Sequence, residues 1–300
     1  MINLGLKHIP QKSTKLFQFE MMDYCKINLE NTINSGQVFL WEKKQDFWYG
    51  IDGQDILKVN ASGKIKNYSN RKRDYFREKD DLEIILKSIS KDPITRKAVK
   101  QYQGLRLIRQ DPFQCLISFI LSSNSNIQKI KTTLENICRV FGEKVSFEGN
   151  EFYLFPEPKT LATSSIEEIK KCGAGYRSKF VKIASEMIKS ERINLEDLKK
   201  YEYQKSKETV LSVPGIGNKV ADCILLFSLD KLEAFPLDRW IIRILEKYYP
   251  RVFEINTKSI TNKQYDILHQ RISDYFGPYS GYAQQFLFKM ERENYQKKWL

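Results

Sequence analysis

The hydrophobic positions in the first third of the chain come in short runs separated by residues that favour turns. Runs rich in β-branched and aromatic side chains occur at 37–41, 47–51 and 56–59. The turn-prone pairs Asp52-Gly53 and Ser62-Gly63 follow two of them. This alternation predicts an antiparallel sheet, and from about residue 70 the composition becomes charged and typical of helices.

Farther along the chain the hydrophobic positions recur at helical spacing. Asp111-Pro112 predicts a helix start, and the helix at 113–121 is apolar on nearly all sides and should be buried. Gly142 closes the next helix, whose apolar face is formed by Ile127, Ile130, Leu134, Ile137 and Phe141. Further amphipathic helices are predicted near 165–172, 176–190, 194–212, 238–248 and 262–276.

These patterns predict an α+β fold. An N-terminal antiparallel β-sheet domain at 1–103 would be followed by an all-helical body at 104–300. The sequence contains no internal repeat and no low-complexity tract.

The charge balance points to a polyanionic partner. Lys and Arg number 50 against 37 Asp and Glu, a formal net charge of +13. Nucleic acid is the first candidate and an anionic membrane surface the second. A basic protein without either partner is the alternative that charge alone leaves open.

Cysteine and histidine usage argues against disulfides and metal centres. The five cysteines show no close pairing, which fits a reducing compartment and no metal site: Cys25, Cys115, Cys138, Cys172 and Cys223. Only two histidines, His8 and His269, are present. The N-terminus lacks the apolar segment of a signal peptide, and no apolar run could span a bilayer. We expect an intracellular protein, cytoplasmic or nucleoid-associated in a prokaryote and nuclear in a eukaryote.

The segment at 211–223 predicts two helices joined by a glycine-containing hairpin. Val213-Pro214-Gly215-Ile216-Gly217 ends the first helix and leaves backbone amides uncovered at the start of the second. Such amides form a docking site for one phosphate, with Gly215, Gly217 and Val220 as the candidate residues. A plain tight turn between helices is the alternative.

With Lys219 and, nineteen residues later, Asp238, this hairpin resembles the helix-hairpin-helix DNA glycosylase superfamily. The run Lys219-Val220-Ala221-Asp222-Cys223 is similar to its 8-oxoguanine DNA glycosylase branch, and the resemblance extends from about residue 30 to 290. It implies a base-excision repair glycosylase with AP lyase activity. Two helical sub-domains would flank the DNA, and a monomer would bind duplex containing oxidised guanine. No cofactor is required, although main-chain carbonyls of the hairpin could hold a cation.

Lys219 is the candidate nucleophile. It falls in the first turn of the second helix, where the positive end of the helix dipole disfavours a charged ammonium. A neutral amine can attack the sugar C1′, expel the base and leave a Schiff base, from which β-elimination removes the 3′ phosphate. A surface lysine that contacts phosphate is the alternative.

Asp238 is the second candidate catalytic residue. It stands where a loop ends and a helix begins, a position that favours aspartate as an N-cap. The resemblance implies that it stabilises the oxocarbenium-like sugar and helps to deprotonate the nucleophile. Capping fixes the direction of the carboxylate, so the two roles are compatible.

The resemblance also implies a pocket for the extruded base. The carbonyl of Gly36 would accept a hydrogen bond that only the oxidised purine can donate. Cys223 would pack on one face of the base and Phe288 on the other, while Gln284 would bond its Watson–Crick edge. A simple turn at Gly36 and a core aromatic at Phe288 are the alternatives.

A further group of residues would fill the space that the base leaves. Asn124 would enter it, Tyr176 would wedge the stack, and Arg177 would contact the opposite cytosine. Lys129 replaces an arginine of the family and cannot form the same bidentate contact, which puts strict cytosine preference in doubt. Trp240 replaces a histidine that contacts phosphate in animal members. Helix caps and an exposed helix start are the alternative interpretations of these residues.

Two other functions stay open at this stage. A related glycosylase could prefer another damaged base. A non-catalytic DNA-binding module could use the hairpin only as a phosphate clamp, and it would then form no covalent intermediate.

Overall fold

The computed structural model describes residues 26–255 and 260–296. His8 and Cys25 lie outside the described residues. Four antiparallel strands form a sheet in the order β1-β2-β3-β4: β1 Trp41–Lys44, β2 Phe47–Asp52, β3 Asp55–Asn60 and β4 Ile65–Asn67. The predicted N-terminal antiparallel sheet is therefore confirmed.

The first predicted strand begins later than expected. Residues 37–40 form turns, and only Trp41 of the predicted run 37–41 is in a strand. The physical reason is the buried Gln37, whose side-chain amide donates to the carbonyls of Thr32 (3.0 Å) and Arg106 (2.9 Å). These bonds hold the segment as an irregular connection and leave it out of the sheet.

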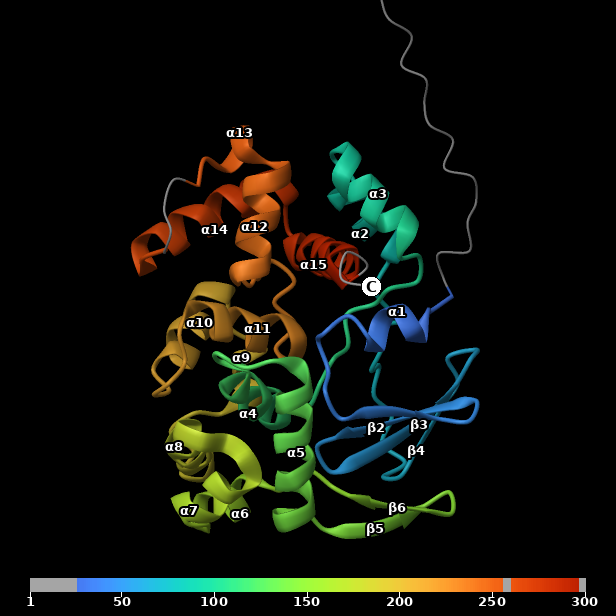
Figure 1. The fold of residues 1–300 in the computed structure, drawn as a ribbon, viewed down its shortest axis with the longest axis vertical. Helices are drawn as coiled ribbons and strands as arrows, with labels where there is room; N and C mark the ends of the chain where they lie inside the picture. Colours follow the sequence, from blue (N-terminus) through green and yellow to red (C-terminus); the bar gives the residue numbers. More distant parts are fainter. Residues whose placement is uncertain (1–25, 256–259, 297–300) are drawn as a thin grey trace, which may run out of the picture.

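Helices make up most of the remaining structure (Figure 1). They are α1 Leu29–Ile33, α2 Leu82–Ile89, α3 Pro93–Gln101, α4 Pro112–Ser122, α5 Ile127–Phe141, α6 Pro158–Thr163, α7 Ile166–Ile169, α8 Ser178–Lys189, α9 Leu195–Leu198, α10 Tyr203–Leu211, α11 Asn218–Ser228, α12 Arg239–Tyr248, α13 Pro250–Phe253, α14 Asn262–Phe276 and α15 Ser280–Gln296. The π-helical turn η1 Lys170–Ala174 and the 3₁₀ turn η2 Gly175–Arg177 connect α7 to α8.

The α+β fold class is confirmed, with one addition to the helical body. Two four-residue strands, β5 Lys144–Phe147 and β6 Asn150–Tyr153, pair as a hairpin. Glu148 and Gly149 occupy its turn with φ of 52° and 74°, the positive values that a tight two-residue turn requires. Strands this short give little periodicity, so the sequence pattern did not predict them.

The helix predicted at 194–212 is two helices, α9 and α10. Between them, the ammonium of the buried Lys231 donates to the carbonyl of Lys199 at 2.9 Å and to that of Tyr201. Because a distant lysine satisfies these carbonyls, the chain can leave the helix there. Local sequence does not contain that information.

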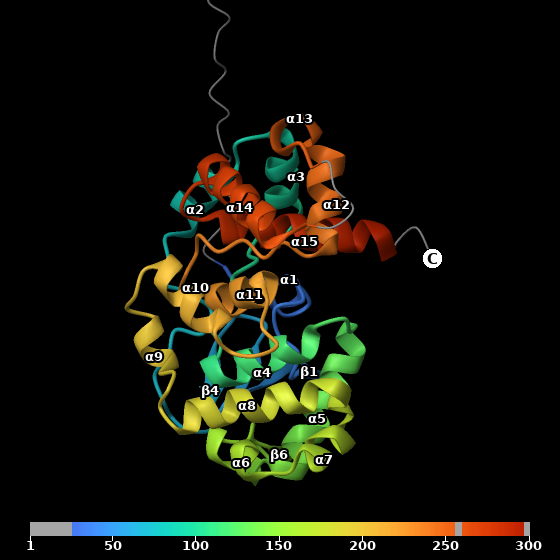
Figure 2. The ribbon, with the colours of Figure 1, turned by 90° about the vertical axis from the view of Figure 1, so that its left-hand side faces the viewer.

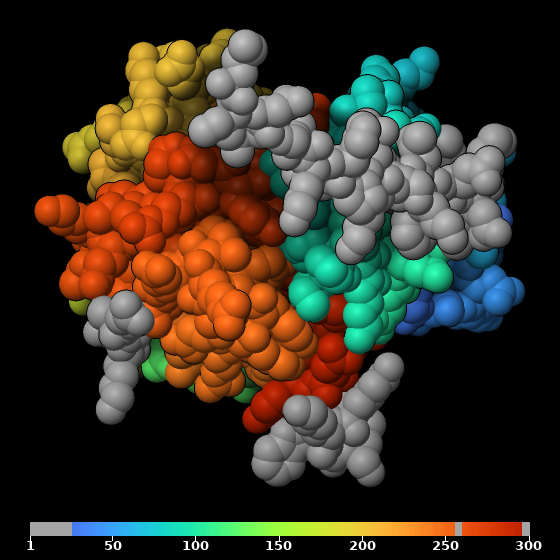
Figure 3. All heavy atoms as spheres, turned by 90° about the horizontal axis from the view of Figure 1, so that it is seen from above, coloured from blue at the N-terminus to red at the C-terminus, as the bar shows by residue number. Residues whose placement is uncertain are grey.

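The elements are arranged in two groups with α11 between them (Figures 1 and 2). One group holds α2, α3 and α12–α15, and the other holds α4–α8 and the two sheets. From above, the orange helices α12–α14 adjoin the teal helices α2 and α3 (Figure 3).

Asp92, the N-cap of α3, accepts hydrogen bonds from Tyr249 (3.1 Å) and Tyr275 (3.2 Å). Thus part of the segment 1–103 packs on the C-terminal helices, and the domain boundary at 103 stays a prediction.

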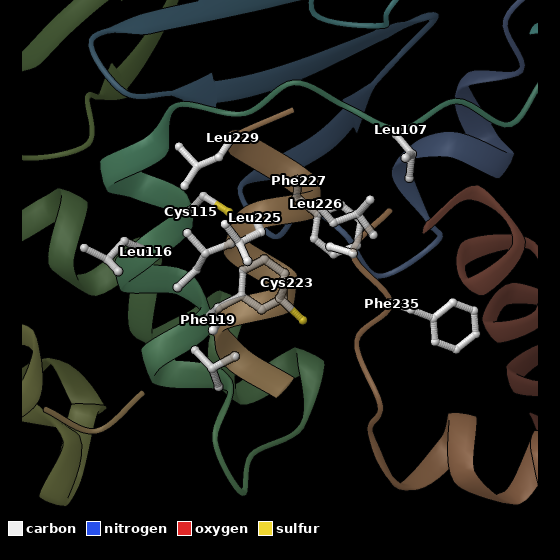
Figure 4. Packing of buried hydrophobic residues seen from close by; sticks show 14 of the residues in the cluster. Leu107, Cys115, Leu116, Phe119, Cys223, Leu225, Leu226, Phe227, Leu229 and Phe235 are labelled. Carbon is white, nitrogen blue, oxygen red and sulfur yellow. The ribbon is translucent and has the colours of Figure 1, made fainter. Parts of the chain in front are cut away.

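The central apolar contact is between α4 and α11 (Figure 4). Phe119 of α4 stacks on Phe227 of α11, with ring centroids 5.5 Å apart and an interplanar angle of 16°. Residues 113–121 are all buried, as the sequence pattern predicted. Asp111 caps this helix by accepting from the amide of Gln114 at 2.8 Å. The buried packing of α4 against α11 positions the segments at the ends of these two helices.

Two glycines with positive φ provide a test of this packing. A Cβ at Gly53 (φ +62°) would lie 2.8 Å from the carboxylate of Asp111, whereas a Cβ at Gly149 (φ +74°) meets nothing within 4 Å. We expect Gly149→Ala to lower the free energy of unfolding by about 1 kcal/mol, from backbone strain alone. Gly53→Ala should lower it by about 2–4 kcal/mol, because Asp111 is held as a cap and crowding adds to the strain. Equal costs in urea unfolding would contradict this account.

Candidate active site

Lys219 lies in the first turn of α11, directly after the hairpin. Its amine is 3.5 Å from the hydroxyl of Ser122 at the end of α4 and 5.5 Å from the ring centroid of Phe119. Within residues 26–255 and 260–296, no carboxylate forms an ion pair with this amine. The lysine is therefore held by a hydroxyl and an aromatic face, and its nitrogen is not locked in a salt bridge.

Asp238 is the N-cap of α12, as the sequence predicted. One carboxylate oxygen accepts hydrogen bonds from the amides of Trp240 (2.9 Å) and Ile241 (2.8 Å). Burial raises the pKa of the Asp238 carboxyl above its ordinary value, while these amides and the ammonium of Lys219 oppose the rise. The second oxygen stays available to act on a positive centre near Lys219.

Cys223 completes a group with these two residues. It lies one turn after Lys219 on α11, and its side chain is buried. Burial raises the pKa of the Cys223 thiol to about 12, although Lys219 opposes the rise. A thiol this weakly acidic is neutral at physiological pH, so Cys223 can serve as an apolar wall and not as a nucleophile.

The hairpin between α10 and α11 presents backbone to solvent. Gly215 (φ +87°) and Gly217 are exposed, whereas Val220 is buried and anchors α11. A Cβ at Gly215 would lie 2.4 Å from the ring of Phe180, so the turn can approach α8 only with glycine there. Gly217 is the N-cap of α11 and provides no side-chain cap. Its φ is −104°, so within this hairpin only Gly215 of the two glycines has left-handed backbone. The first amides of α11 are left for an anion.

The loop that carries Gly36 is fixed by α15. Gln285 donates to the carbonyl of Ser35 at 2.8 Å, and Lys289 donates to that of Asn34 at 3.3 Å. A Cβ at Gly36 (φ +85°) would lie 3.1 Å from the ring of Phe288, so these two predicted pocket residues are in contact. No donor in the described part of the chain bonds to the Gly36 carbonyl. It remains an acceptor for a ligand.

Gln284 carries a buried acceptor without a partner. Its side chain is 4% exposed, and its amide oxygen has no hydrogen bond in the structure. An unpaired buried amide oxygen costs about 1–3 kcal/mol, which a ligand that donates to it would recover. Gln284 and Phe288 lie one turn apart on α15, on the same face.

The residues predicted to touch the opposite strand lie in the turn between α4 and α5, on α5 itself and on the turn before α8. Asn124 (φ 49°), Lys129 and Tyr176 are exposed, Tyr176 by 57%. Arg177, in contrast, is buried: it donates to the carbonyls of Ser123 (2.7 Å) and Asn124 (3.0 Å). Arg177 thus joins the turn before α8 to the Asn124 segment and holds its left-handed backbone.

The structure brings the predicted residues together in three sets. Lys219, Asp238 and Cys223 interact electrostatically, Gly36 touches Phe288, and Arg177 binds the backbone of Asn124. Sequence patterns did not predict Ser122 as a partner of the Lys219 amine. They also did not predict that Arg292 of α15 lies beside Gly36. Both contacts join segments that are distant in the chain, and only the fold brings them together.

The described residues contain neither a metal-binding cluster nor a membrane-spanning helix. Among the described residues, no group of three or more His, Cys, Asp or Glu side chains could hold a metal ion. In that same part of the chain, no helix has the length and apolar character to cross a bilayer. Four cysteines, Cys115, Cys138, Cys172 and Cys223, are free and buried. A cation on the hairpin carbonyls stays a prediction.

Comparison with known proteins covers almost the whole chain. Family models match at 21–116 (8-oxoguanine DNA glycosylase, N-terminal domain) and at 117–270 (HhH-GPD superfamily base excision DNA repair protein). The chain is 30% identical to the N-glycosylase/DNA lyase OGG1 of Arabidopsis thaliana over 293 residues, which cover 90% of this chain and 79% of that protein. It is 27% identical to the N-glycosylase/DNA lyase of Saccharomyces cerevisiae, covering 88% and 83%.

A solved structure shows the same fold. The 8-oxoguanine glycosylase/lyase of Clostridium acetobutylicum, in complex with double-stranded DNA containing cytosine opposite 8-oxoguanine, superposes with a TM-score of 0.80. It is 32% identical and covers 90% of this chain and 93% of that one. The chain therefore belongs to the HhH-GPD superfamily of base excision DNA repair proteins, in the branch that carries the N-terminal domain of 8-oxoguanine DNA glycosylases.

Proposed function

We propose that this protein is a bifunctional glycosylase and AP lyase that excises 8-oxoguanine from duplex DNA. The observation that carries the proposal is the Lys219 amine, which forms no ion pair with a described carboxylate although it interacts electrostatically with the largely buried carboxyl of Asp238. The neutral amine attacks the sugar C1′, and the glycosidic bond breaks with its electrons going to the base. The bond from C1′ to the ring oxygen then opens, the ring oxygen takes up a proton, and a Schiff base forms. Loss of a proton from C2′ then forms a C2′–C3′ double bond and expels the 3′ phosphate.

In this reaction Asp238 would stabilise positive charge on the sugar. Positive charge develops on the sugar as the base leaves, and a carboxylate fixed by two amides stabilises that charge without having to move. The second oxygen of the same carboxylate would accept the proton that the Lys219 amine releases. The cap therefore supplies both the position and the orientation that the chemistry requires.

The base pocket would be formed by Gly36, Cys223, Gln284 and Phe288. The unpaired carbonyl of Gly36 supports selection of a purine with N–H at the imidazole nitrogen, because normal guanine would leave this acceptor unmatched. The unpaired amide oxygen of Gln284 supports contact with the Watson–Crick edge. Selection of the oxidised base would then depend on the Gly36 acceptor, and recognition of the guanine edge on the Gln284 acceptor, neither of which has a partner among the described residues.

On the opposite strand we propose weaker selection for cytosine. Asn124 and Tyr176 would enter the base stack of the DNA, which they can do because both side chains are exposed. The ammonium of Lys129 is a point charge that cannot form a bidentate contact. The guanidinium of Arg177 already donates to two backbone carbonyls. The exposed hairpin with Gly215 and Gly217 would bind one phosphate of the lesion strand. We further propose that the protein acts inside the cell as a monomer.

A buried hydrogen-bond chain supports the position of Asp238. Asp222 of α11, fully buried, accepts from Tyr203 and from Tyr265, both at 2.6 Å. The hydroxyl of Tyr265 in turn accepts from the amide of Leu237 at 3.1 Å, one residue before Asp238. The helix that carries Lys219 is thereby connected to the loop that delivers the aspartate.

Replacing the nucleophile tests the function directly. We expect Lys219→Gln to lose both 8-oxoguanine release and strand cleavage while it still binds the lesion duplex, because an amide can neither attack C1′ nor form an imine. Single-turnover assays of free base and of nicked strand measure the two steps. Full base release by this variant would overturn the mechanism.

The pH dependence of base excision tests the role of Asp238. Burial raises the pKa of this carboxyl above 3.8, and lowering the pH protonates it and removes the charge that stabilises the sugar. The acidic limb of the single-turnover rate should therefore lie above pH 3.8. Asp238→Asn should bind DNA normally and be slow at every pH. A variant that kept the wild-type rate would contradict the assignment.

Two tyrosine variants distinguish a role in positioning Asp238 from a role in stability alone. Tyr265→Phe should destabilise the protein by about 1–3 kcal/mol, because it leaves buried groups without a partner, and should also lower the excision rate. Tyr249→Phe, which removes a similar buried contact to Asp92, should destabilise without changing the rate. Urea unfolding and single-turnover kinetics give the comparison. Equal rates for the two variants would mean that Tyr265 is only structural.

A further inference from the structure

Arg292 of α15 is a half-buried cation beside the predicted base pocket. A Cβ at Gly36 would lie 3.1 Å from the Nη1 of Arg292 and 3.1 Å from the ring of Phe288, so these three residues meet at one point. Gln284, Phe288 and Arg292 follow one another at four-residue spacing, hence on one face of α15. Arg292 stands one turn beyond the residue that would stack on the base.

This guanidinium forms no ion pair with a described carboxylate, although Glu293 acts on it electrostatically. Over residues 26–255 and 260–296, no carboxylate forms an ion pair with Arg292. Its neighbour Glu293 is already engaged by Lys289 at 2.7 Å and by the hydroxyl of Tyr102 at 3.0 Å. Burial lowers the pKa of Arg292 below its ordinary value, which reflects incomplete compensation of the charge. Partly desolvated cations are costly unless an anion meets them.

The position of Arg292 indicates which anion it meets. Three residues farther on, Tyr295 contacts Trp240 edge-to-face at 4.9 Å, and Trp240 is the second residue after Asp238. The last turns of α15 thus extend from the Gly36 loop to the start of α12. A nucleotide with its base between Cys223 and Phe288, beside the Gly36 carbonyl, and its sugar near Asp238 would place its own backbone along these turns. A guanidinium there would meet phosphate, and the base edge would lie two turns deeper, at Gln284.

We propose that Arg292 is a binding residue for a phosphate that flanks the extruded nucleotide. The inference rests on the proposed function, because it requires a nucleotide in the pocket. A guanidinium forms two parallel hydrogen bonds to a phosphate, so the contact would hold the nucleotide in its extruded position. It is thus a second phosphate contact on the lesion strand, distinct from the hairpin at Gly215.

The test uses duplexes with a tetrahydrofuran abasic analogue opposite cytosine, which have no base for Arg292 to contact. Arg292→Ala should weaken binding roughly tenfold and reduce the slope of log Kd against log salt by about 1. Arg292→Lys should recover part of the affinity. Arg251→Ala, on an exposed arginine of α13, serves as the matched control and should leave affinity unchanged.

A second measurement changes the charge of the DNA backbone. A single neutral methylphosphonate, placed 5′ or 3′ to the abasic analogue, should weaken wild-type binding at one of the two positions and have no further effect on Arg292→Ala. If neither position affects the wild type, or if both proteins lose affinity equally, the proposal is wrong. If Arg292→Ala loses affinity only when a base is present, Arg292 reads the base and the proposal is also wrong. Failure of Lys219-dependent excision would instead contradict the proposed function.

Discussion

The proposed chemistry depends on a lysine and a carboxylate that interact electrostatically but form no ion pair among the described residues. Lys219 is held by the hydroxyl of Ser122 and the face of Phe119, while Asp238 is held by two amides of its own helix. A direct ion pair would stabilise both charges and make the amine a poor nucleophile. The buried contact of α4 with α11, together with the cap of α12, keeps the two groups apart and oriented.

The rest of the site is positioned by side chains that bond to backbone carbonyls of distant segments. Gln285 and Lys289 fix the loop before Gly36, and Arg177 fixes the turn at Asn124. Such contacts hold a loop rigidly while they leave its own functional groups unpaired. The acceptors at Gly36 and Gln284 have no partner among the described residues, and in the proposed function they would receive donors of the base without a change of fold.

Local patterns predicted the parts of the fold that depend on local physics. The cap at Asp238, the start of α4 after Asp111 and the apolar face of α5 follow from spacing and helix termini alone. Several contacts that sequence could not predict join distant segments. Lys231 separates α9 from α10, and Arg292 reaches Gly36, because the packed fold brings these residues together. The resemblance to a family named the candidate site residues, and the structure added how they are held.

The most direct test of the central claim is to locate the covalent bond. The wild-type protein would be incubated with a duplex carrying one 8-oxoguanine opposite cytosine, in the presence of borohydride. The adduct would then be digested and analysed by peptide mass spectrometry. The account predicts a reduced adduct on Lys219 and on no other lysine. An adduct on another residue, or base release with no adduct at all, would contradict it.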